Sequence, residues 1–476
     1  MQHLTWAITG KENQVMWKVS RRDVLRAGVA AAVSGLGFGA AGTLAQAPAA
    51  FRPRQDKSVE VLHPQGRVPL SFFIDDSTCL VNMGHFCMPQ FAEAWPEQQI
   101  YKRPWKTWPR EIPDAFLREF GEFCAEHGVK GKFSIVPYPA CVGWLDRELP
   151  GWSRHELRDS LKLVRELMVP NWDIHPEMIS HTRVIDIRTG RPMEEISSAT
   201  MENSYPQNRK SVDELAAYLA YALKILKNCE LPCEGITTPG GFGSSVRSEL
   251  GLAARQAVTD VFNAEVPHYF KYISEGNEST QPKLEHLEGA DSDNPRFVVN
   301  VAAGTGDWFG NWDGDSEPQG ARYANRDATD GRMVELIERG EPAIMLCHWP
   351  GLYSQGTKRG FADCKQVILA LEGRFRNRTI WMKIGEIARY WAAKELTRIE
   401  RNGARITLAA PFASPRFTVK ITGIAGTQPK LTRDGQVSLL NEVSQLRDLK
   451  SGTWLRQPAS SIVCFDLPKG RSQLSF

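Results

Sequence analysis

Short apolar runs and amphipathic runs alternate along residues 67–396, and this alternation constrains the fold more than any other feature of the chain. Runs such as 68–74 and 343–347 are apolar at most positions, which is typical of strands buried on both faces. Runs such as 113–127 and 211–227 have apolar residues at helical spacing. Repeated strand–helix units imply parallel strands joined by right-handed crossovers. We therefore predict the α/β class and a distorted β/α barrel of about seven strands, with a doubly wound sheet as the alternative.

The rest of this region follows the same pattern. The other predicted strands span residues 131–137, 172–180, 235–238, 261–263, 297–301 and 380–382. The other predicted helices span residues 153–167, 329–339, 362–372 and 384–396. Residues 77–112 interrupt the pattern with an insertion that contains Trp95, Trp105, Trp108 and several prolines. We assign residues 67–398 to one domain.

The pattern changes after this domain. Residues 399–476 contain short β-branched runs separated by Gly and Pro, which predict a small antiparallel β module. Its predicted strands span residues 404–408, 416–421, 436–440 and 461–465. Residues 48–66 are rich in Pro and charged residues and predict a linker. The sequence leaves the role of the β module and the oligomeric state open.

Residues 1–47 have the pattern of an export signal. The pair Arg21-Arg22 precedes a Gly- and Ala-rich run at 27–44, and Ala45-Gln46-Ala47 offers a cleavage site. This arrangement resembles a bacterial twin-arginine signal, which predicts a periplasmic or secreted protein. The apolar run is too weakly hydrophobic to be a convincing membrane span.

Removal of residues 1–47 leaves a chain with balanced charge. The full chain has 58 Lys and Arg residues and 55 Asp and Glu residues. Five of the basic and two of the acidic residues lie in this segment, so 53 of each remain. No basic stripe favours nucleic acid or an anionic membrane surface as a partner.

Reactive side chains follow the ends of successive predicted strands. These side chains are Asp75, Asp76, His175, Glu177, His181, Asp307 and His348. Because the carboxyl ends of parallel strands lie on one face, one pocket can hold them all. The adjacent carboxylates Asp75 and Asp76 repel each other unless a cation lies near them. A metal ion is the usual cation at such a site.

In this order, the motifs resemble those of the polysaccharide deacetylase family, which are metal-dependent carbohydrate esterases on a distorted β/α barrel. The resemblance covers about residues 68–348. Its five motifs are Phe73-Ile74-Asp75-Asp76, Ser180-His181-Thr182, Thr238-Pro239-Gly240-Gly241, Asp307-Trp308 and Leu346-Cys347-His348.

The resemblance implies a role for each motif. Asp75 corresponds to the catalytic base, and His348 to the general acid. Asp76 and His181 correspond to ligands of a divalent metal, for which we expect Zn²⁺. The metal activates a water molecule, which attacks the carbonyl of an N- or O-acetyl group on a carbohydrate.

Two positions depart from the family pattern. Ile185 stands where the family has a second metal-binding His, and Thr237 stands where it has an Arg that orients the base. His175 is the predicted replacement ligand, because it can approach the same ion as His181 if the chain bends at Pro176, and His85 is the second choice.

The resemblance also indicates residues for binding the substrate. Apolar walls are expected from Trp308 and Trp349, and a backbone donor for the oxyanion is expected near Tyr138 or in the Pro239-Gly240 loop. Asp307 is the remaining residue that is expected to bind the substrate. The function implied is that of a hydrolase acting on carbon–nitrogen or ester bonds of carbohydrates.

Two alternatives stay open. A glycosidase on a similar barrel uses two carboxylates, here Asp75 or Asp76 with Glu177 or Asp307. A non-catalytic carbohydrate-binding protein would have kept the fold and lost part of the metal site.

Overall fold

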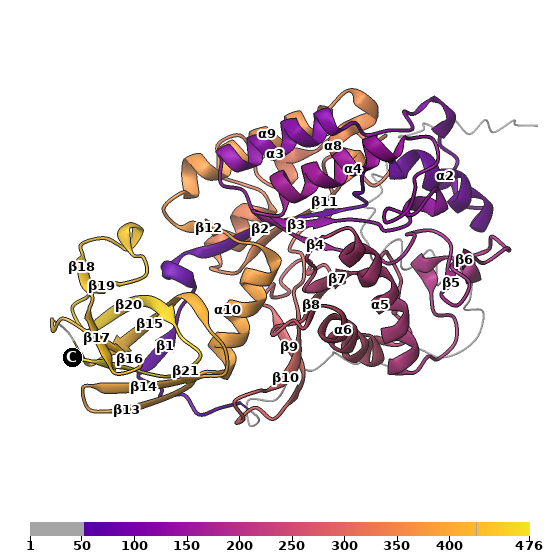
Figure 1. Cartoon of the computed structure of the whole chain (residues 1–476). Helices are drawn as coiled ribbons and strands as arrows, with labels where there is room; N and C mark the ends of the chain where they lie inside the picture. The colour runs from indigo at the N-terminus through magenta and orange to yellow at the C-terminus, as the bar shows by residue number, and fades with distance from the viewer. Residues whose placement is uncertain (1–51, 425) are drawn as a thin grey trace, which may run out of the picture.

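The structure, a computed structural model, describes residues 52–424 and 426–476, and the predicted export signal at 1–47 lies outside the described residues. Parallel strands and helices form one side of the molecule, and an antiparallel β part near the C-terminus forms the other (Figure 1). Within the described residues, no helix combines the length and the apolar character needed to span a membrane.

The first sheet is built around β2 (Val68–Asp75). Its other strands are β3 (Gly131–Ser134), β4 (Trp172–His175), β11 (Ala343–His348) and β12 (Thr379–Trp381). All pairings are parallel. In register, Asp75 lies beside His348, and Ser134 lies beside His175. The polar ends of four strands therefore meet at one edge of this sheet.

The second sheet has the order β7-β8-β10-β9. It consists of β7 (Gly235–Thr237), β8 (His268–Phe270), β10 (Arg296–Asn300) and the antiparallel β9 (Lys283–Glu288). The two sheets approach each other at two places. Glu177 forms a single parallel bridge to Thr237, and the amide of Gly304 donates to the carbonyl of Ile344 at 2.9 Å. The parallel strands thus lie in two sheets, and the predicted barrel is not confirmed.

Helices cover the outer faces of both sheets (Figure 1). On the first sheet, Phe120 of α3 (Asp114–Glu126) packs against Phe72 of β2, with ring centroids 6.3 Å apart. On the second sheet, α5 (Val212–Asn228) packs against α6 (Arg247–Phe262). Further helices are α4 (Arg154–Leu163), α9 (Arg359–Phe375) and α10 (Ile384–Leu396). α4 and α5 begin with capping boxes, in which the Ser N-cap and the Glu three residues later bond each other's backbone.

The predicted strand at 261–263 is wrong. Val261 belongs to the last turn of α6, which buries Ala253, Ala257 and Val258 along one face. The helix ends at Asn263, which adopts a left-handed φ of 53°. The strand of this region lies five residues further on, as β8.

The insertion at 77–112 contains a helix that the sequence analysis missed. α2 (Met83–Ala94) begins at Asn82, whose side chain accepts from the amide of Gly84 at 3.2 Å. Pro89 lies inside the helix. Because proline is unfavourable in the interior of a helix, its presence argued against a helix in this segment.

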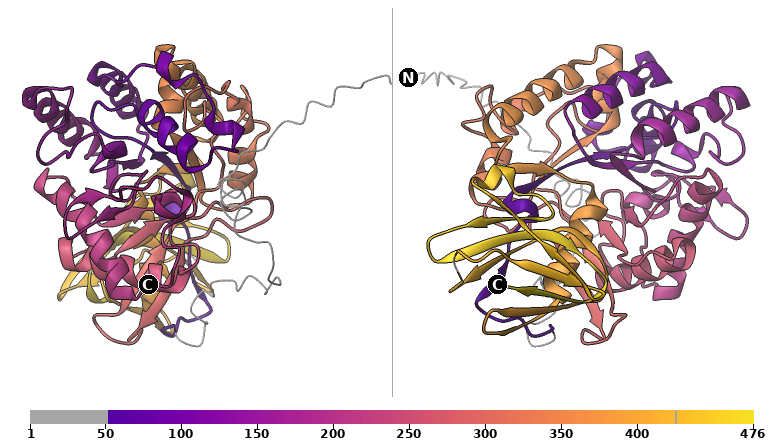
Figure 2. Two further views of the ribbon diagram at one scale, coloured as in Figure 1. Left: turned by 90° about the vertical axis from the view of Figure 1, so that its right-hand side faces the viewer. Right: turned by 60° about the vertical axis from the view of Figure 1, so that its left-hand side comes forward.

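The C-terminal part consists of two five-stranded sheets, with the orders β1-β15-β20-β19-β18 and β13-β14-β21-β16-β17 (Figure 2). It begins after α10, with β13 at Arg398–Asn402. The predicted linker is not a simple connection, because β1 (Val59–Val61) pairs with β15 (Ser414–Thr422). The remaining strands here are β14 (Arg405–Ala410), β16 (Lys430–Arg433), β17 (Gln436–Leu439), β18 (Asn441–Val443), β19 (Thr453–Arg456), β20 (Ser460–Leu467) and β21 (Gly470–Ser475).

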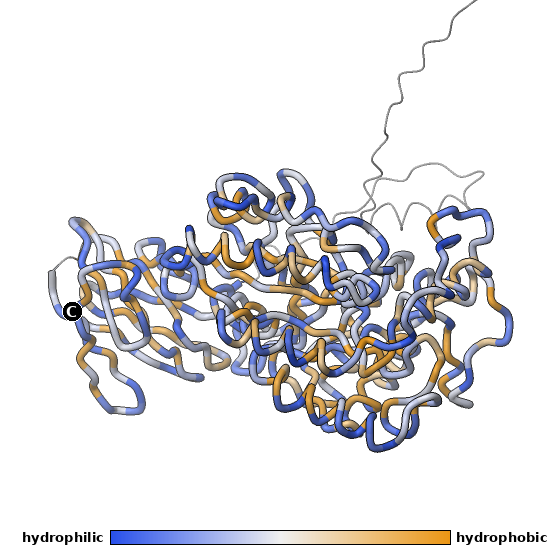
Figure 3. Tube along the Cα trace, turned by 90° about the horizontal axis from the view of Figure 1, so that it is seen from above, coloured by the Kyte–Doolittle hydropathy of each residue, from blue (hydrophilic) through white to orange (hydrophobic). Residues whose placement is uncertain are grey.

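Strand β2 contributes to two hydrophobic cores. Phe72 and Ile74 point toward the outer helices, whereas Phe73 joins a core with Trp391 of α10 and Phe417 of β15. The β part therefore shares its core with the inner side of the parallel strands. Apolar segments run along the strands of both parts (Figure 3).

Candidate metal centre

The chain changes direction where β2 ends, and this turn aims Asp76 into a pocket. Asp75 is the last residue of β2, and Asp76 adopts a left-handed φ of 57°. Such a conformation is uncommon for a residue other than Gly and is concentrated at functional sites. The amide of Asp76 donates to Oε2 of Glu177 at 2.8 Å. The two adjacent aspartates therefore have separate surroundings.

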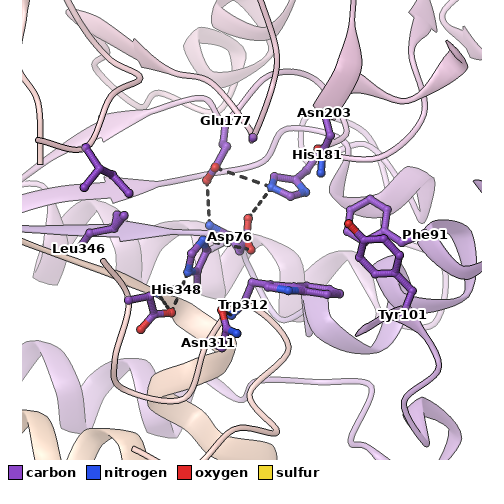
Figure 4. A pocket seen from close by; sticks show the side chains of 13 residues that line it. Asp76, Phe91, Tyr101, Glu177, His181, Asn203, Asn311, Trp312, Leu346 and His348 are labelled. Carbon is purple, nitrogen blue, oxygen red and sulfur yellow. Dashed lines mark hydrogen bonds and ion pairs between the residues drawn. The ribbon is translucent and has the colours of Figure 1, made fainter. Parts of the chain in front are cut away.

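Three buried side chains converge beyond this turn (Figure 4). Asp76, Glu177 and His181 each offer one ligand atom, and these atoms lie within 4.8 Å of one another. Nε2 of His181 lies 2.6 Å from Oδ1 of Asp76 and 3.7 Å from Oε1 of Glu177. We call these three residues the carboxylate–histidine cluster.

The electrostatics of the cluster favour a cation. Burial, together with the charges of Asp75 and Asp76, raises the pKa of Glu177 to about 7. Burial acts to lower the pKa of His181, but the charge and hydrogen bond of Asp76 prevail and hold it well above its ordinary value. The cluster thus holds protons tightly, and a divalent cation would neutralise the same carboxylates.

The residues present fit a divalent metal. Two carboxylates and one imidazole provide three ligand atoms, and such a set leaves positions open for water or substrate. Imidazole suits zinc, whereas a second carboxylate makes the set harder and also suits manganese. The neighbouring Cys87 interacts with His181, but burial raises the pKa of its thiol to about 11, which keeps it protonated.

Asp75 lies behind the cluster in a fully buried ion pair with Lys132. Nζ of Lys132 contacts Oδ1 of Asp75 and also donates to the carbonyl of Ile74 at 3.1 Å and to Oγ of Ser134 at 2.9 Å. Lys132 therefore supplies a cation to Asp75. In the polysaccharide deacetylases, an Arg at the position of Thr237 orients the corresponding base. The signal in the sequence was a lysine inside the buried strand β3.

His348 forms the opposite side of the site (Figure 4). Its Nδ1 lies 2.7 Å from Oδ2 of Asp307, and its Nε2 lies 3.9 Å from Oδ2 of Asp76. Burial acts to lower the pKa of this imidazole, but Asp76 and Asp307 prevail and raise it to about 9. His348 is therefore protonated at neutral pH, with Asp307 fixing its orientation.

His175 does not belong to the cluster, and Glu177 takes the place predicted for it. The imidazole of His175 is buried between β4, β7 and β8, where its Nε2 lies 3.1 Å from Nε2 of His268. Its Nδ1 lies 3.3 Å from Oγ1 of Thr237. The reason is local: β4 ends at His175, so its side chain keeps the direction set by the strand.

Two of the predicted substrate-binding residues line the pocket, namely Gly240 and Asp307. Trp308 instead packs against Arg322, whose guanidinium carbon lies 4.2 Å from the ring centroid. Trp349 is a core residue, with its ring centroid 4.8 Å from that of Phe116. These two tryptophans are therefore not the walls of the pocket.

The other two predictions also lie outside the pocket lining. Tyr138 stacks on Trp144, with ring centroids 3.9 Å apart. Pro239 precedes the lining residue Gly240 but does not line the pocket itself.

The aromatic wall of the pocket comes from residues that the sequence analysis missed. Phe91 of α2, Tyr101 from the same insertion and Trp312 from the segment after β10 all line it. The ring centroid of Phe91 lies 5.3 Å from that of Trp312 and 5.4 Å from that of Tyr101. The only signal in the sequence was the high Trp content of the insertion at 77–112. The tryptophans of this insertion, Trp95, Trp105 and Trp108, do not line the pocket.

No family model and no curated protein matches the chain. Among solved structures, a mutant of a CE4 family pseudoenzyme is 11% identical, covering 69% of this chain and 70% of that chain, with a TM-score of 0.29. A protein from Parabacteroides distasonis assigned as a glycoside hydrolase/deacetylase is 10% identical, with coverages of 79% and 84% and a TM-score of 0.37. A Thermotoga maritima α-fucosidase is 11% identical, with coverages of 86% and 94% and a TM-score of 0.27. At these TM-scores the likeness identifies no function for this chain.

Proposed function

We propose that this protein is a metal-dependent hydrolase that removes acetyl groups from carbohydrates, as the polysaccharide deacetylases do. The observation that carries the proposal is the carboxylate–histidine cluster at the pocket. It is flanked by a buried, cation-paired carboxylate at Asp75 and by the His348–Asp307 pair. A metal-dependent deacetylase uses a metal site, a base and an acid, and these three groups offer them.

The residues of the chain divide the work as follows. A divalent cation, for which we propose Zn²⁺ with Mn²⁺ as the alternative, would polarise the acyl carbonyl and lower the pKa of water toward about 7. Lys132 forms a buried ion pair with Asp75, and a neighbouring ammonium favours the ionised carboxylate that a general base requires. The charge and hydrogen bond of Asp307 favour the protonated form of His348, which can donate its proton to the leaving amine or hydroxyl of the sugar.

The pocket favours a sugar as the substrate. Phe91, Tyr101 and Trp312 offer ring faces and edges beside the cluster, against which the apolar face of a sugar ring can pack. Asn203 and Asn311 add amide groups that can bond hydroxyls. The twin-arginine pattern at 1–47 fits a periplasmic or secreted enzyme.

The arrangement favours a metal over the two-carboxylate chemistry of a glycosidase. A glycosidase places its carboxylates on either side of the scissile bond. Here Oδ1 of Asp76 and Oε1 of Glu177 both lie close to Nε2 of His181. The two carboxylates thus point to a common centre, which suits a shared cation.

Acetate release tests the proposal. The mature protein, loaded with zinc or manganese, is expected to release acetate from chito-oligosaccharides or acetylated xylan and to lose this activity with a chelator. Asp75→Asn is expected to keep the metal and to lower kcat by about 10²–10⁴-fold, the contribution of a general base. Release of reducing sugar without release of acetate would instead favour the glycosidase.

A further inference from the structure

A buried carboxylate outside the pocket lining holds the segment that carries two residues of the cluster. Glu202 is fully buried at the start of the short helix η8 (Glu202–Ser204). Its Oε2 accepts from the amides of Ser180 and His181 at 3.1 and 2.6 Å. Its Oε1 accepts from the amide of Ile179 at 3.1 Å and from the hydroxyl of Tyr218 at 2.6 Å.

The segment held in this way has an unusual backbone. Met178 and His181 adopt left-handed φ values of 55° and 65°. A residue other than Gly persists in this conformation only where its surroundings impose it. The three consecutive amides are buried and need acceptors, and the carboxylate of Glu202 supplies all three.

Helix α5 anchors the carboxylate from the other side. The hydroxyl of Tyr218 donates to Glu202 and accepts from the amide of Ile185 at 3.1 Å. The amide of Glu202 donates to the carbonyl of Thr182 at 2.6 Å. The segment that ends in His181 is therefore fixed to η8 and to α5 by one connected network.

We propose that Glu202 is a positioning residue for the metal. It holds the backbone of residues 179–181 so that Glu177 and His181 present their ligand atoms to the same point. The inference rests on the proposed function, because it assigns Glu202 a task only if the cluster binds a cation.

The substitution Glu202→Gln tests this role at nearly constant shape. Glutamine has one carbonyl oxygen in place of two carboxylate oxygens, so it must oppose donor to donor on one side of the network. Binding of Zn²⁺ alone to the mature protein is measured by competition with a chromophoric chelator. We expect binding to weaken by about tenfold or more, as is typical for groups that orient metal ligands.

Tyr218→Phe is a milder variant that keeps all three amide contacts of the carboxylate. It is expected to fold and to weaken zinc binding by a smaller factor than Glu202→Gln.

The matched control is Glu285, a second buried carboxylate that also accepts a hydrogen bond from a tyrosine. Glu285 accepts from the hydroxyl of Tyr269 at 2.6 Å and from Nδ2 of Asn300 at 3.0 Å. Glu285→Gln and Tyr269→Phe are expected to lower the melting temperature and to leave zinc affinity unchanged.

The outcomes separate the inference from the proposed function. Wild-type affinity in both Glu202→Gln and Tyr218→Phe overturns the positioning role and leaves the metal centre standing. An equal loss of affinity in Glu285→Gln also overturns it, because the effect is then one of general stability. Failure of the wild-type protein to bind zinc or manganese overturns the proposed function together with this inference.

Discussion

His175 and His181 lie six residues apart in the chain, and both are buried, but their surroundings differ in charge. The imidazole of His175 faces His268 and Thr237, and no carboxylate contacts it in the described part of the chain. The imidazole of His181 faces the carboxylates of Asp76 and Glu177.

The pKa values of the two imidazoles are consequently shifted in opposite directions. Burial, His268 and Lys132 hold the pKa of His175 well below its ordinary value. At His181, burial is outweighed by Asp76, and the pKa lies well above its ordinary value. The charge around a buried histidine, rather than its burial, therefore decides whether it can join a cation site.

Removal of each histidine in turn tests whether only His181 is needed for metal binding. His181→Ala is expected to abolish metal binding and acetate release, because it removes the only imidazole of the cluster. His175→Ala is expected to keep the metal and to lose stability through the cavity that it leaves. Elemental analysis of both variants measures the difference, and loss of metal from a folded His175→Ala variant would contradict it.

Lys132 extends the comparison from the histidines to the adjacent aspartates. Lys132→Met leaves the carboxylate of Asp75 buried without its cation, and breaking a buried pair in this way costs about 3–5 kcal/mol. The free energy of unfolding is measured with urea in the presence of a chelator.

The double variant Lys132→Met/Asp75→Asn serves as the control. It is expected to recover part of the loss, because no unpaired charge then stays buried. An undiminished free energy of unfolding in Lys132→Met would show that Asp75 does not depend on this cation.

The dependence of stability on pH tests the lowered pKa of His175. Below pH of about 6.5 the unfolded chain protonates His175 and His268, whereas the folded chain holds the pKa of both below that value. At these two groups the unfolded state then binds more protons, so their contribution to the free energy of unfolding falls as pH falls, by up to about 1.4 kcal/mol per pH unit for each histidine. Groups whose pKa the fold raises, namely His181, His348 and Glu177, contribute with the opposite sign. Urea unfolding of the wild type and of His175→Gln at pH 7.0 and 5.5 therefore isolates the share of His175, and the free energy of unfolding of His175→Gln is expected to fall less, or to rise more, as pH falls. A slope that His175→Gln leaves unchanged would contradict the assignment.

Trp312 is expected to have the smallest effect. Trp312→Ala removes one ring of the pocket wall and is expected to raise KM about two- to tenfold with little change in kcat, since one aromatic contact contributes about 0.5–1.5 kcal/mol. Trp308→Ala is the matched control, because Trp308 packs on Arg322 outside the pocket lining. An equal rise in KM for both variants would show that the wall is assigned incorrectly.

The sequence predicted much of the α/β pattern because its helices and strands have strong periodicity and clear caps. It missed α2, where Pro89 interrupts the pattern, and misread the end of α6 as a strand. The role of β1 was invisible, because its pairing with β15 joins residues far apart in the chain.

In the site, Asp76, His181 and His348 were selected by their positions after strands, and the structure brings all three to one pocket. Glu177 was expected at the pocket but not among the metal ligands, and Lys132 was missed, because their roles depend on how the chain turns after β4 and on which strand pairs with β2. Periodicity carries no information about either.

The metal content of the wild-type protein tests the central claim most directly. Mature protein purified without chelator, or reloaded with Zn²⁺ or Mn²⁺ and freed of excess metal, is analysed for bound metal. The carboxylate–histidine cluster predicts about one divalent ion per chain, and Glu177→Ala is expected to lose it. Protein that retains no divalent ion after reloading would contradict the account.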